Sequence, residues 1–294
     1  MKKTIITACS LFALLVTTPV MAAEPDVEEI VSKANLAAYY AGDDGKAEVN
    51  MTITDSQGRE RTREFIILRK DKEDGGAQFF YVYFKKPSDV SKMVFMVHKH
   101  VDKDDDRWMY LPALDLVKRI AASDKRTSFV GSNFLYEDVS GRNLSEDKHE
   151  LLESNDAQYV IKNTPTKPDD VEFSSYTVQI DKKTFLPVKA VYLDKNGKEY
   201  RIVEATKVED VDGIPTVTES KVTDLAAGSN TVSKFSKIKY NIGLKEEIFT
   251  ERYLRRPPRE AQLCSIWPDE IVLLNPSGCS ETAVVLEVMA HTNT

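Results

Sequence analysis

Short runs in which apolar and polar residues alternate, separated by turn-forming residues, recur along most of this chain. In the second half they lie near residue 150 and at residues 158–163, 173–181, 188–193, 199–207, 215–224 and 232–240. Two of the intervening turns carry Asn196-Gly197 and Asp212-Gly213, dipeptides that accept the positive φ angles of a tight hairpin. Regular short strands joined in this way favour an antiparallel sandwich or barrel over alternating parallel units. We therefore expect one large all-β domain.

A single helix precedes the strands of the first half. Residues 25–41 predict it, because Asp26 can cap its start and apolar residues recur at helical spacing from Val27 to Ala38. The period changes to two after Gly42, and a first hairpin turns at residues 55–58. One face of this helix is apolar, so we expect it to be buried.

The N-terminus has the pattern of a Sec signal peptide. Lys2 and Lys3 precede an apolar core over residues 5–16, and small residues follow near Ala22, the expected cleavage point. The apolar core is too short to span a bilayer, and Cys9 lies too early to be an acylation site at the cleavage point. We therefore expect residues 1–22 to be removed and the product to be a soluble periplasmic protein, with an uncut N-terminal anchor as the alternative.

Charge and cysteine content exclude some classes of protein. The chain has 40 Lys and Arg against 47 Asp and Glu, and loss of Lys2 and Lys3 takes the net charge from −7 to −9. A balance this acidic argues against a general nucleic-acid binder. Only Cys264 and Cys279 remain after cleavage, so the fold cannot depend on a disulfide framework, and spacing alone does not show whether these two cysteines pair.

Motifs for catalysis, cofactors and metals are weak. Gly131-Ser132 lacks the second glycine of a nucleophile elbow, and no glycine-rich loop joins a strand to a helix for a dinucleotide. His98, His100 and Asp102 share one face of an extended strand and are the best metal candidates, but the polar rim of a barrel explains them equally well. We expect no catalytic residues, no cofactor and no metal site.

Aromatic residues and methionines are concentrated between residues 79 and 110, on strands with apolar residues on both faces. Next to them, residues 129–136 form an apolar segment that we name the flap. Core packing explains part of this pattern, but one face can pack on structure while the other lines a cavity that suits an acyl chain. The candidate cavity and flap residues are Phe80, Val82, Phe84, Phe95, Trp108, Tyr110, Phe129, Phe134 and Tyr136. Lys118 and Arg119 could meet a lipid headgroup or an acidic partner, or could be a solvated part of the strand.

Three motifs carry a specific resemblance. Trp108-Met-Tyr-Leu-Pro112, Lys118-Arg-Ile120 and Phe129-Val-Gly-Ser-Asn-Phe134, the last followed by Tyr136-Glu-Asp138, resemble the outer-membrane lipoprotein-sorting-like family of bacterial periplasmic proteins, which are LolA-like members of the lipoprotein carrier superfamily. The likeness continues to Phe249–Leu254, whereas the tail over residues 261–294 has no counterpart. The resemblance implies that residues 23–260 form an open antiparallel β-barrel or half-barrel, with the N-terminal helix and a helical or loop flap covering an apolar cavity.

The same resemblance implies a function. It suggests a periplasmic carrier of lipid or lipoprotein acyl chains that works without covalent catalysis, together with an inner-membrane exporter of the RND type. The leading alternative is an accessory module that binds a transporter or envelope protein without lipid cargo. An envelope hydrolase using His98 or Ser132 ranks lowest, and an integral outer-membrane barrel is disfavoured because charged residues occur on both faces of several strands.

Overall fold

The computed structural model describes residues 26–262. The chain divides into one compact unit over Met1–Ala261 and a second over Gln262–Thr294, and the fold below is that of the first unit. The expected signal peptide, most of the expected tail and the cysteines Cys264 and Cys279 lie outside the described residues.

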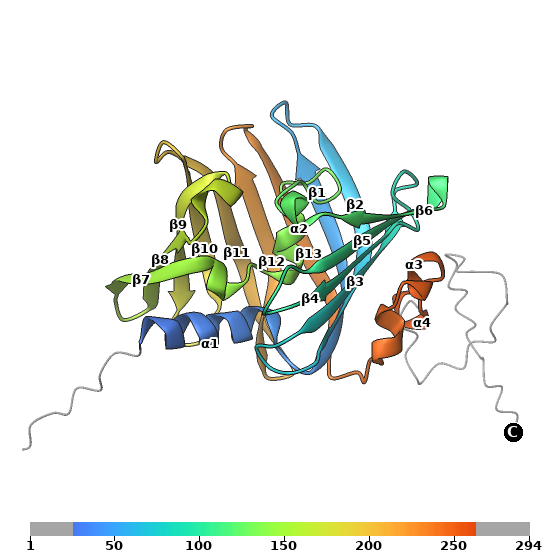
Figure 1. Ribbon diagram of the computed structural model, residues 1–294, viewed down its shortest axis with the longest axis horizontal. Coiled ribbons are helices and arrows are strands. Elements are labelled where there is room, and N and C mark those ends of the chain that lie inside the picture. Colours follow the sequence, from blue (N-terminus) through green and yellow to red (C-terminus); the bar gives the residue numbers. More distant parts are fainter. Residues whose placement is uncertain (1–25, 263–294) are drawn as a thin grey trace, which may run out of the picture. The chain divides into compact units, whose positions relative to one another are not determined.

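Thirteen strands form one antiparallel sheet (Figure 1). The strands are β1 (Asp44–Thr54), β2 (Glu60–Asp71), β3 (Gln78–Lys86), β4 (Val94–Lys99), β5 (Asp106–Leu111), β6 (Leu116–Ile120), β7 (Asp147–Ser154), β8 (Gln158–Pro165), β9 (Phe173–Asp181), β10 (Pro187–Asp194), β11 (Glu199–Val211), β12 (Ile214–Asp224) and β13 (Ser229–Tyr240). Their order is β6-β5-β4-β3-β2-β1-β13-β12-β11-β10-β9-β8-β7. Since β6 and β7 are the two edges, the sheet stays open, and the prediction of a mainly β, open half-barrel is confirmed.

This strand order places the flap. The strands β1–β6 and β7–β13 are two meanders, joined where β1 pairs with β13. The edge strands β6 and β7 are consecutive in the sequence but lie at opposite ends of the sheet, so the chain between them must cross one face. This crossing segment contains η2 (Ala122–Asp124), α2 (Tyr136–Ser140) and η3 (Leu144–Glu146). In Figure 1 it lies inside the curve of the sheet.

The helix α1 (Val27–Tyr39) covers the other part of this inner face. Its buried residues Ile30, Val31 and Ala34 pack against Tyr159 and Ile161 of β8, as the apolar face of the expected helix predicted. Asp26 precedes the helix, but its side chain makes no capping hydrogen bond.

A C-terminal segment covers the outer face of β2–β4. It comprises η5 (Glu246–Phe249), α3 (Arg252–Arg255) and α4 (Arg259–Gln262). The ring of Phe249 stacks on Phe79 with centroids 5.5 Å apart, and the hydroxyl of Tyr81 donates to the carbonyl of Tyr253 at 2.7 Å. Because the flap and this segment cover opposite faces, the strands β3 and β4 are buried on both sides.

The two glycine turns adopt different conformations. Asp212 and Gly213 both have positive φ, at 54° and 85°, as a tight hairpin requires. At the other turn Gly197 has a φ of 79°, but Asn196 does not have a positive φ. There the Asp194 side chain accepts hydrogen bonds from the backbone of Asn196 and Lys198, which stabilises a longer turn. No helix among residues 26–262 combines the length and apolar character needed to cross a bilayer.

Candidate ligand-binding cavity

A cavity of about 520 Å³ lies between the inner face of the sheet, α1 and the crossing segment. This volume is within the usual range for small-molecule sites. Its walls are mainly apolar and include Ala47, Val49, Met51, Val178, Val203 and Phe235. Strand geometry explains this lining, because successive side chains point to opposite faces and Ala47, Val49 and Met51 therefore share the inner one. The cavity is thus built from both meanders.

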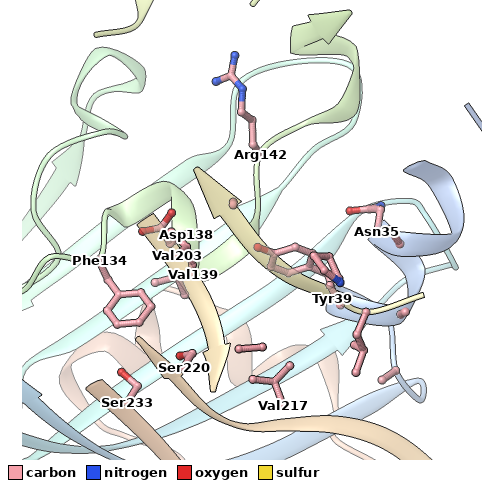
Figure 2. Close-up of a pocket in the computed structure, with 18 of the residues that line it drawn as sticks. Asn35, Tyr39, Phe134, Asp138, Val139, Arg142, Val203, Val217, Ser220 and Ser233 are labelled. Atoms are coloured by element: carbon pink, nitrogen blue, oxygen red, sulfur yellow. The ribbon is translucent and has the colours of Figure 1, made fainter. Parts of the chain in front are cut away.

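Two covers lie over part of the cavity. In Figure 2, Tyr39 from α1 and Phe134, Asp138 and Val139 from the crossing segment lie over the sheet, which contributes Ser220 and other side chains from below. The covers meet at Gly141, where an added Cβ would lie only 2.7 Å from the ring of Tyr39. Gly141 also has a φ of 76°, so glycine suits this position for both conformational and steric reasons.

Four of the nine aromatic and aliphatic residues that the sequence singled out line this cavity. They are Phe80 and Val82 of β3 and Phe129 and Phe134 of the flap.

Three more hold the flap in place without lining the cavity. Phe84 and Phe95 are completely buried, and their ring centroids lie 5.7 and 5.4 Å from that of Phe129. Tyr136 packs on Phe95 at 5.1 Å. These residues form an aromatic cluster that fixes the flap on β3 and β4.

The other two candidates, Trp108 and Tyr110, lie on the outer face of the sheet. In the register of β5 they oppose Met96 and Val94, whose side chains pack under the C-terminal segment. Alternation along β5 leaves Met109 on the inner face, in the same cluster as Phe95. The sequence showed that both faces were apolar but not which residues faced which cover.

The basic pair Lys118 and Arg119 is divided between the faces of β6. Lys118 lines a smaller pocket of about 230 Å³ together with Met93, Met109 and Tyr136. Arg119 forms an ion pair with Asp106 and lies 5.9 Å from the centre of the Trp108 ring. Neither residue lines the main cavity.

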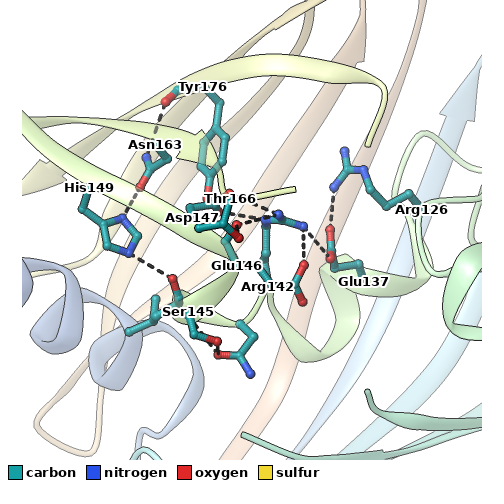
Figure 3. A network of polar contacts seen from close by, with 12 residues as sticks. Arg126, Glu137, Arg142, Ser145, Glu146, Asp147, His149, Asn163, Thr166 and Tyr176 are labelled. Atoms are coloured by element: carbon teal, nitrogen blue, oxygen red, sulfur yellow. Dashed lines mark hydrogen bonds and ion pairs between the residues drawn. The ribbon is translucent and has the colours of Figure 1, made fainter. Parts of the chain in front are cut away.

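A buried ion network anchors the crossing segment beside the cavity (Figure 3). Glu137 of α2 is 3% exposed and lies between Arg126, at 2.5 Å, and Arg142, at 3.2 Å. Arg142 also pairs with Asp147 of β7 at 2.8 Å, and Tyr176 of β9 donates to the same carboxylate at 2.7 Å. Burial alone would raise the pKa of Glu137, but the charges of Arg126, Arg142 and Lys125 hold this pKa below its usual value. The segment is therefore tied to the sheet by charge as well as by aromatic packing.

A second buried pair joins α2 to β11. Arg201 donates to Asp138 at 2.5 Å, and its guanidinium lies 5.1 Å from the centre of the Tyr192 ring. Burial raises the pKa of the Asp138 carboxyl, and the charge of Arg201 only partly opposes this effect. Arg201 shares the inner face with Val203 and Ala205, two and four residues further along the strand.

The sequence analysis named Glu137 and Asp138 only as part of the motif that follows the flap, and it did not identify the arginines that pair with them. One signal could have found Arg201, because a charged residue at an inward position of an otherwise apolar strand requires a buried partner. The pairing with Arg126 and Arg142 depends on how the crossing segment folds back, which no local pattern states.

The histidines near residue 100 make other contacts. Nε2 of His98 lies 2.7 Å from the carbonyl oxygen of Phe249, and Nε2 of His100 lies 3.0 Å from Oδ2 of Asp106. Within residues 26–262 no three His, Cys, Asp or Glu side chains gather in a group that could hold a metal ion.

Comparisons with known proteins agree with this architecture. A family model described as "-like: Uncharacterized protein" matches residues 76–256, more than half of the chain. A search of curated proteins finds no match.

Among solved structures, a DUF1329 family protein from Desulfovibrio piger is 30% identical, with 78% of this chain and 97% of that chain covered and a TM-score of 0.70. An outer membrane lipoprotein-sorting protein domain from Vibrio parahaemolyticus is 26% identical over 78% and 97%, with a TM-score of 0.71. A LolA superfamily protein from Nitrosomonas europaea, at 19% identity over 77% and 98% and a TM-score of 0.60, shares the fold. The chain therefore belongs to the family of the DUF1329 protein, and it shares its fold with the lipoprotein-sorting domain and with the LolA superfamily protein.

Proposed function

We propose that this protein is a periplasmic carrier that holds the acyl chains of a lipid or lipoprotein in its cavity, without covalent catalysis. The observation that carries this proposal is the apolar cavity of about 520 Å³ between the sheet, α1 and the crossing segment. The printed description of the Vibrio parahaemolyticus relative, a lipoprotein-sorting domain, supports the same class of cargo.

Apolar transfer alone is sufficient for such binding. Removing one methylene from water contributes about 0.8 kcal/mol. One long acyl chain therefore supplies on the order of 10 kcal/mol before the cost of ordering it. A site of this kind needs shape and apolar walls, not a reacting group.

The crossing segment provides a route for entry and release. Phe134 and Val139 line the cavity, so a ligand competes with them for the same apolar surface. Hydrogen bonds join the tip of the flap to β13: the backbone N–H of Asn133 donates to Thr231 at 3.0 Å, and its side-chain amide donates to Ser229 at 2.8 Å. We propose that this tip moves while the ion network around Glu137 stays in place.

The wider setting belongs to the same proposal. A signal peptide over residues 1–22 would deliver the carrier domain, residues 23–260, to the periplasm. There an inner-membrane exporter of the RND type would be the partner that supplies or removes the cargo.

Native mass spectrometry of gently purified protein tests the proposal. We expect a co-purifying lipid at about one per chain, and we expect Phe134→Asp to reduce its retention more than it reduces stability, because Phe134 closes the cavity. The matched control is Leu152→Asp, which places the same charge at an exposed position of the edge strand β7.

Equal lipid retention in wild type and both variants would contradict a cavity role for Phe134. Absence of lipid, with no uptake from vesicles, would favour the accessory module that binds an envelope protein instead.

A further inference from the structure

The polar groups of the cavity fall into two classes, paired charges and uncharged groups. Each charged side chain that faces the cavity has a partner within residues 26–262. Arg142 pairs with Glu137 and Asp147, and Asp138 pairs with Arg201. Arg69 is held by Asp71 and by backbone carbonyls of residues 39, 41 and 42.

Some of the uncharged groups are paired as well, such as Tyr176 with Asp147 and Thr216 with Tyr240, but two phenols are not. The hydroxyls of Tyr39 and Tyr192 line the cavity, yet neither makes a hydrogen bond within the described part of the chain. Figure 2 shows Tyr39 extending from α1 towards the crossing segment, with its hydroxyl end directed to the side of Asp138. Burial raises the pKa of both phenols, so both stay protonated and can donate a hydrogen bond.

The two phenols lie in the same region of the cavity. The Tyr192 phenol is among the groups that raise the pKa of Tyr39, and Asp138 contributes to the shifts of both. Two donors therefore line the part of the cavity next to Asp138. Neither hydroxyl oxygen is among the fully buried atoms without a partner, so water can reach both, and a ligand that displaces this water must supply acceptors in its place.

An enclosed ligand must satisfy these donors without bringing a charge of its own. A charged headgroup inside the cavity would find every opposite charge already paired, and its loss of hydration would outweigh the hydrogen bonds it gained. A carbonyl oxygen at the end of an acyl chain meets both requirements, since it is uncharged and accepts hydrogen bonds.

We propose that the cavity encloses an uncharged diacylglyceryl group, with its ester carbonyls at Tyr39 and Tyr192, and that any charged headgroup stays outside. This inference rests on the proposed carrier function and specifies its ligand. A glycerophospholipid and the acylated end of a lipoprotein both carry this group, so the enclosed chemistry is the same for either cargo.

Displacement of a fluorescent fatty acid from the delipidated mature chain provides the test. The competitors are a diacylglycerol, the dialkyl ether with the same chains but no carbonyls, and a phosphatidylglycerol with the same chains. We expect Tyr39→Phe and Tyr192→Phe each to weaken diacylglycerol binding about fivefold and to leave ether binding unchanged. Tyr159→Phe is the matched control, because it removes a phenol hydroxyl from the α1 cluster outside the cavity.

Three results would overturn the inference. One is equal loss of ester and ether binding in the Phe variants, and another is wild-type binding of the ester that is no tighter than that of the ether. The third is phosphatidylglycerol binding more than tenfold tighter than diacylglycerol, which would place a charge inside. Failure of the fluorescent fatty acid to bind at all would instead contradict the carrier function itself. A diacylglyceryl-cysteine peptide in place of phosphatidylglycerol tells the two cargo sources apart by its relative affinity.

Discussion

Glu137 is the residue on which most of the buried charge converges. Its carboxylate contacts Lys125, Arg126 and Arg142, and it is 3% exposed. Glu137→Gln would leave these cations without their shared counter-charge, so we expect a loss of about 3–5 kcal/mol in the free energy of unfolding. Urea denaturation of the mature chain measures it. Glu150→Gln, on an exposed position of β7, is the control and should stay within about 0.5 kcal/mol of wild type.

Glu172, which shares Arg126 with Glu137, makes the stability depend on pH. Burial alone would raise the pKa of Glu172, but the hydrogen bonds and charge of Arg126 lower it to about 2. Because this pKa is below the unfolded value of about 4.3, the stabilisation is complete above pH 4.3 and is lost as the pH falls towards 2. We expect the stability difference between wild type and Glu172→Gln to shrink over that interval. Solvent screening makes this stability difference smaller than the pKa shift of Glu172 implies, since its side chain is 46% exposed.

A difference that stays constant from pH 5 to 2 would contradict this reading of Glu172. Glu199→Gln, at an exposed position of β11, controls for loss of a carboxylate as such.

At the scale of single residues, periodicity predicted which positions are apolar but not which cover they meet. Phe95 and Trp108 are both large and apolar, yet one packs under the flap and the other under the C-terminal segment. To predict which cover each residue meets, one needs the register of β4 and β5 and the paths of the flap and the C-terminal segment. Local patterns do not contain that information.

At the scale of elements, the flap was predictable as an apolar segment beside the sheet, and its motion is the testable part. The backbone nitrogen of Asn133 lies 3.0 Å from Oγ1 of Thr231, so these positions are adjacent across the flap and β13. A disulfide in Asn133→Cys/Thr231→Cys, with Cys264 and Cys279 changed to serine, would hold the tip on the sheet. We expect the oxidised form to exchange lipid much more slowly than the same protein after reduction, as vesicle transfer assays can measure. Equal exchange rates in both forms would show that the tip does not gate the cavity.

The C-terminal segment was less accessible to sequence reasoning. Its residues Leu244, Ile248, Phe249 and Leu254 are buried, but they are spread over short helical turns without a sustained period. Elements of four residues give too few repeats for a pattern to be recognised. Likeness to the family, which extends to Phe249–Leu254, indicated only that the segment belongs to the domain.

At the scale of the whole domain, the strand spacing predicted antiparallel strands in a sandwich or barrel, but it did not predict the topology of the single open sheet. The pairing of β1 with β13 joins residues almost two hundred positions apart, and it separates β6 and β7 to opposite edges. Hairpin turns specify the pairing of strands that are neighbours in the sequence, whereas the pairing of β1 with β13 joins strands that are far apart in the chain. The cavity exists because this pairing brings the two meanders into one sheet.

Ligand binding should therefore stabilise both meanders together. The cavity is lined by β1–β3 of one meander and by β7–β13 of the other, so a ligand that binds only the folded protein stabilises both meanders. At a free lipid concentration of 100 times Kd we expect about 2.7 kcal/mol of added stability, or a rise in Tm of roughly 5–10 °C over delipidated protein. Hydrogen exchange should show the added protection in β1–β3 and in β7–β13 alike. Protection confined to one meander, or an equal rise in Tm for Phe134→Asp, would mean that the lipid binds outside the cavity.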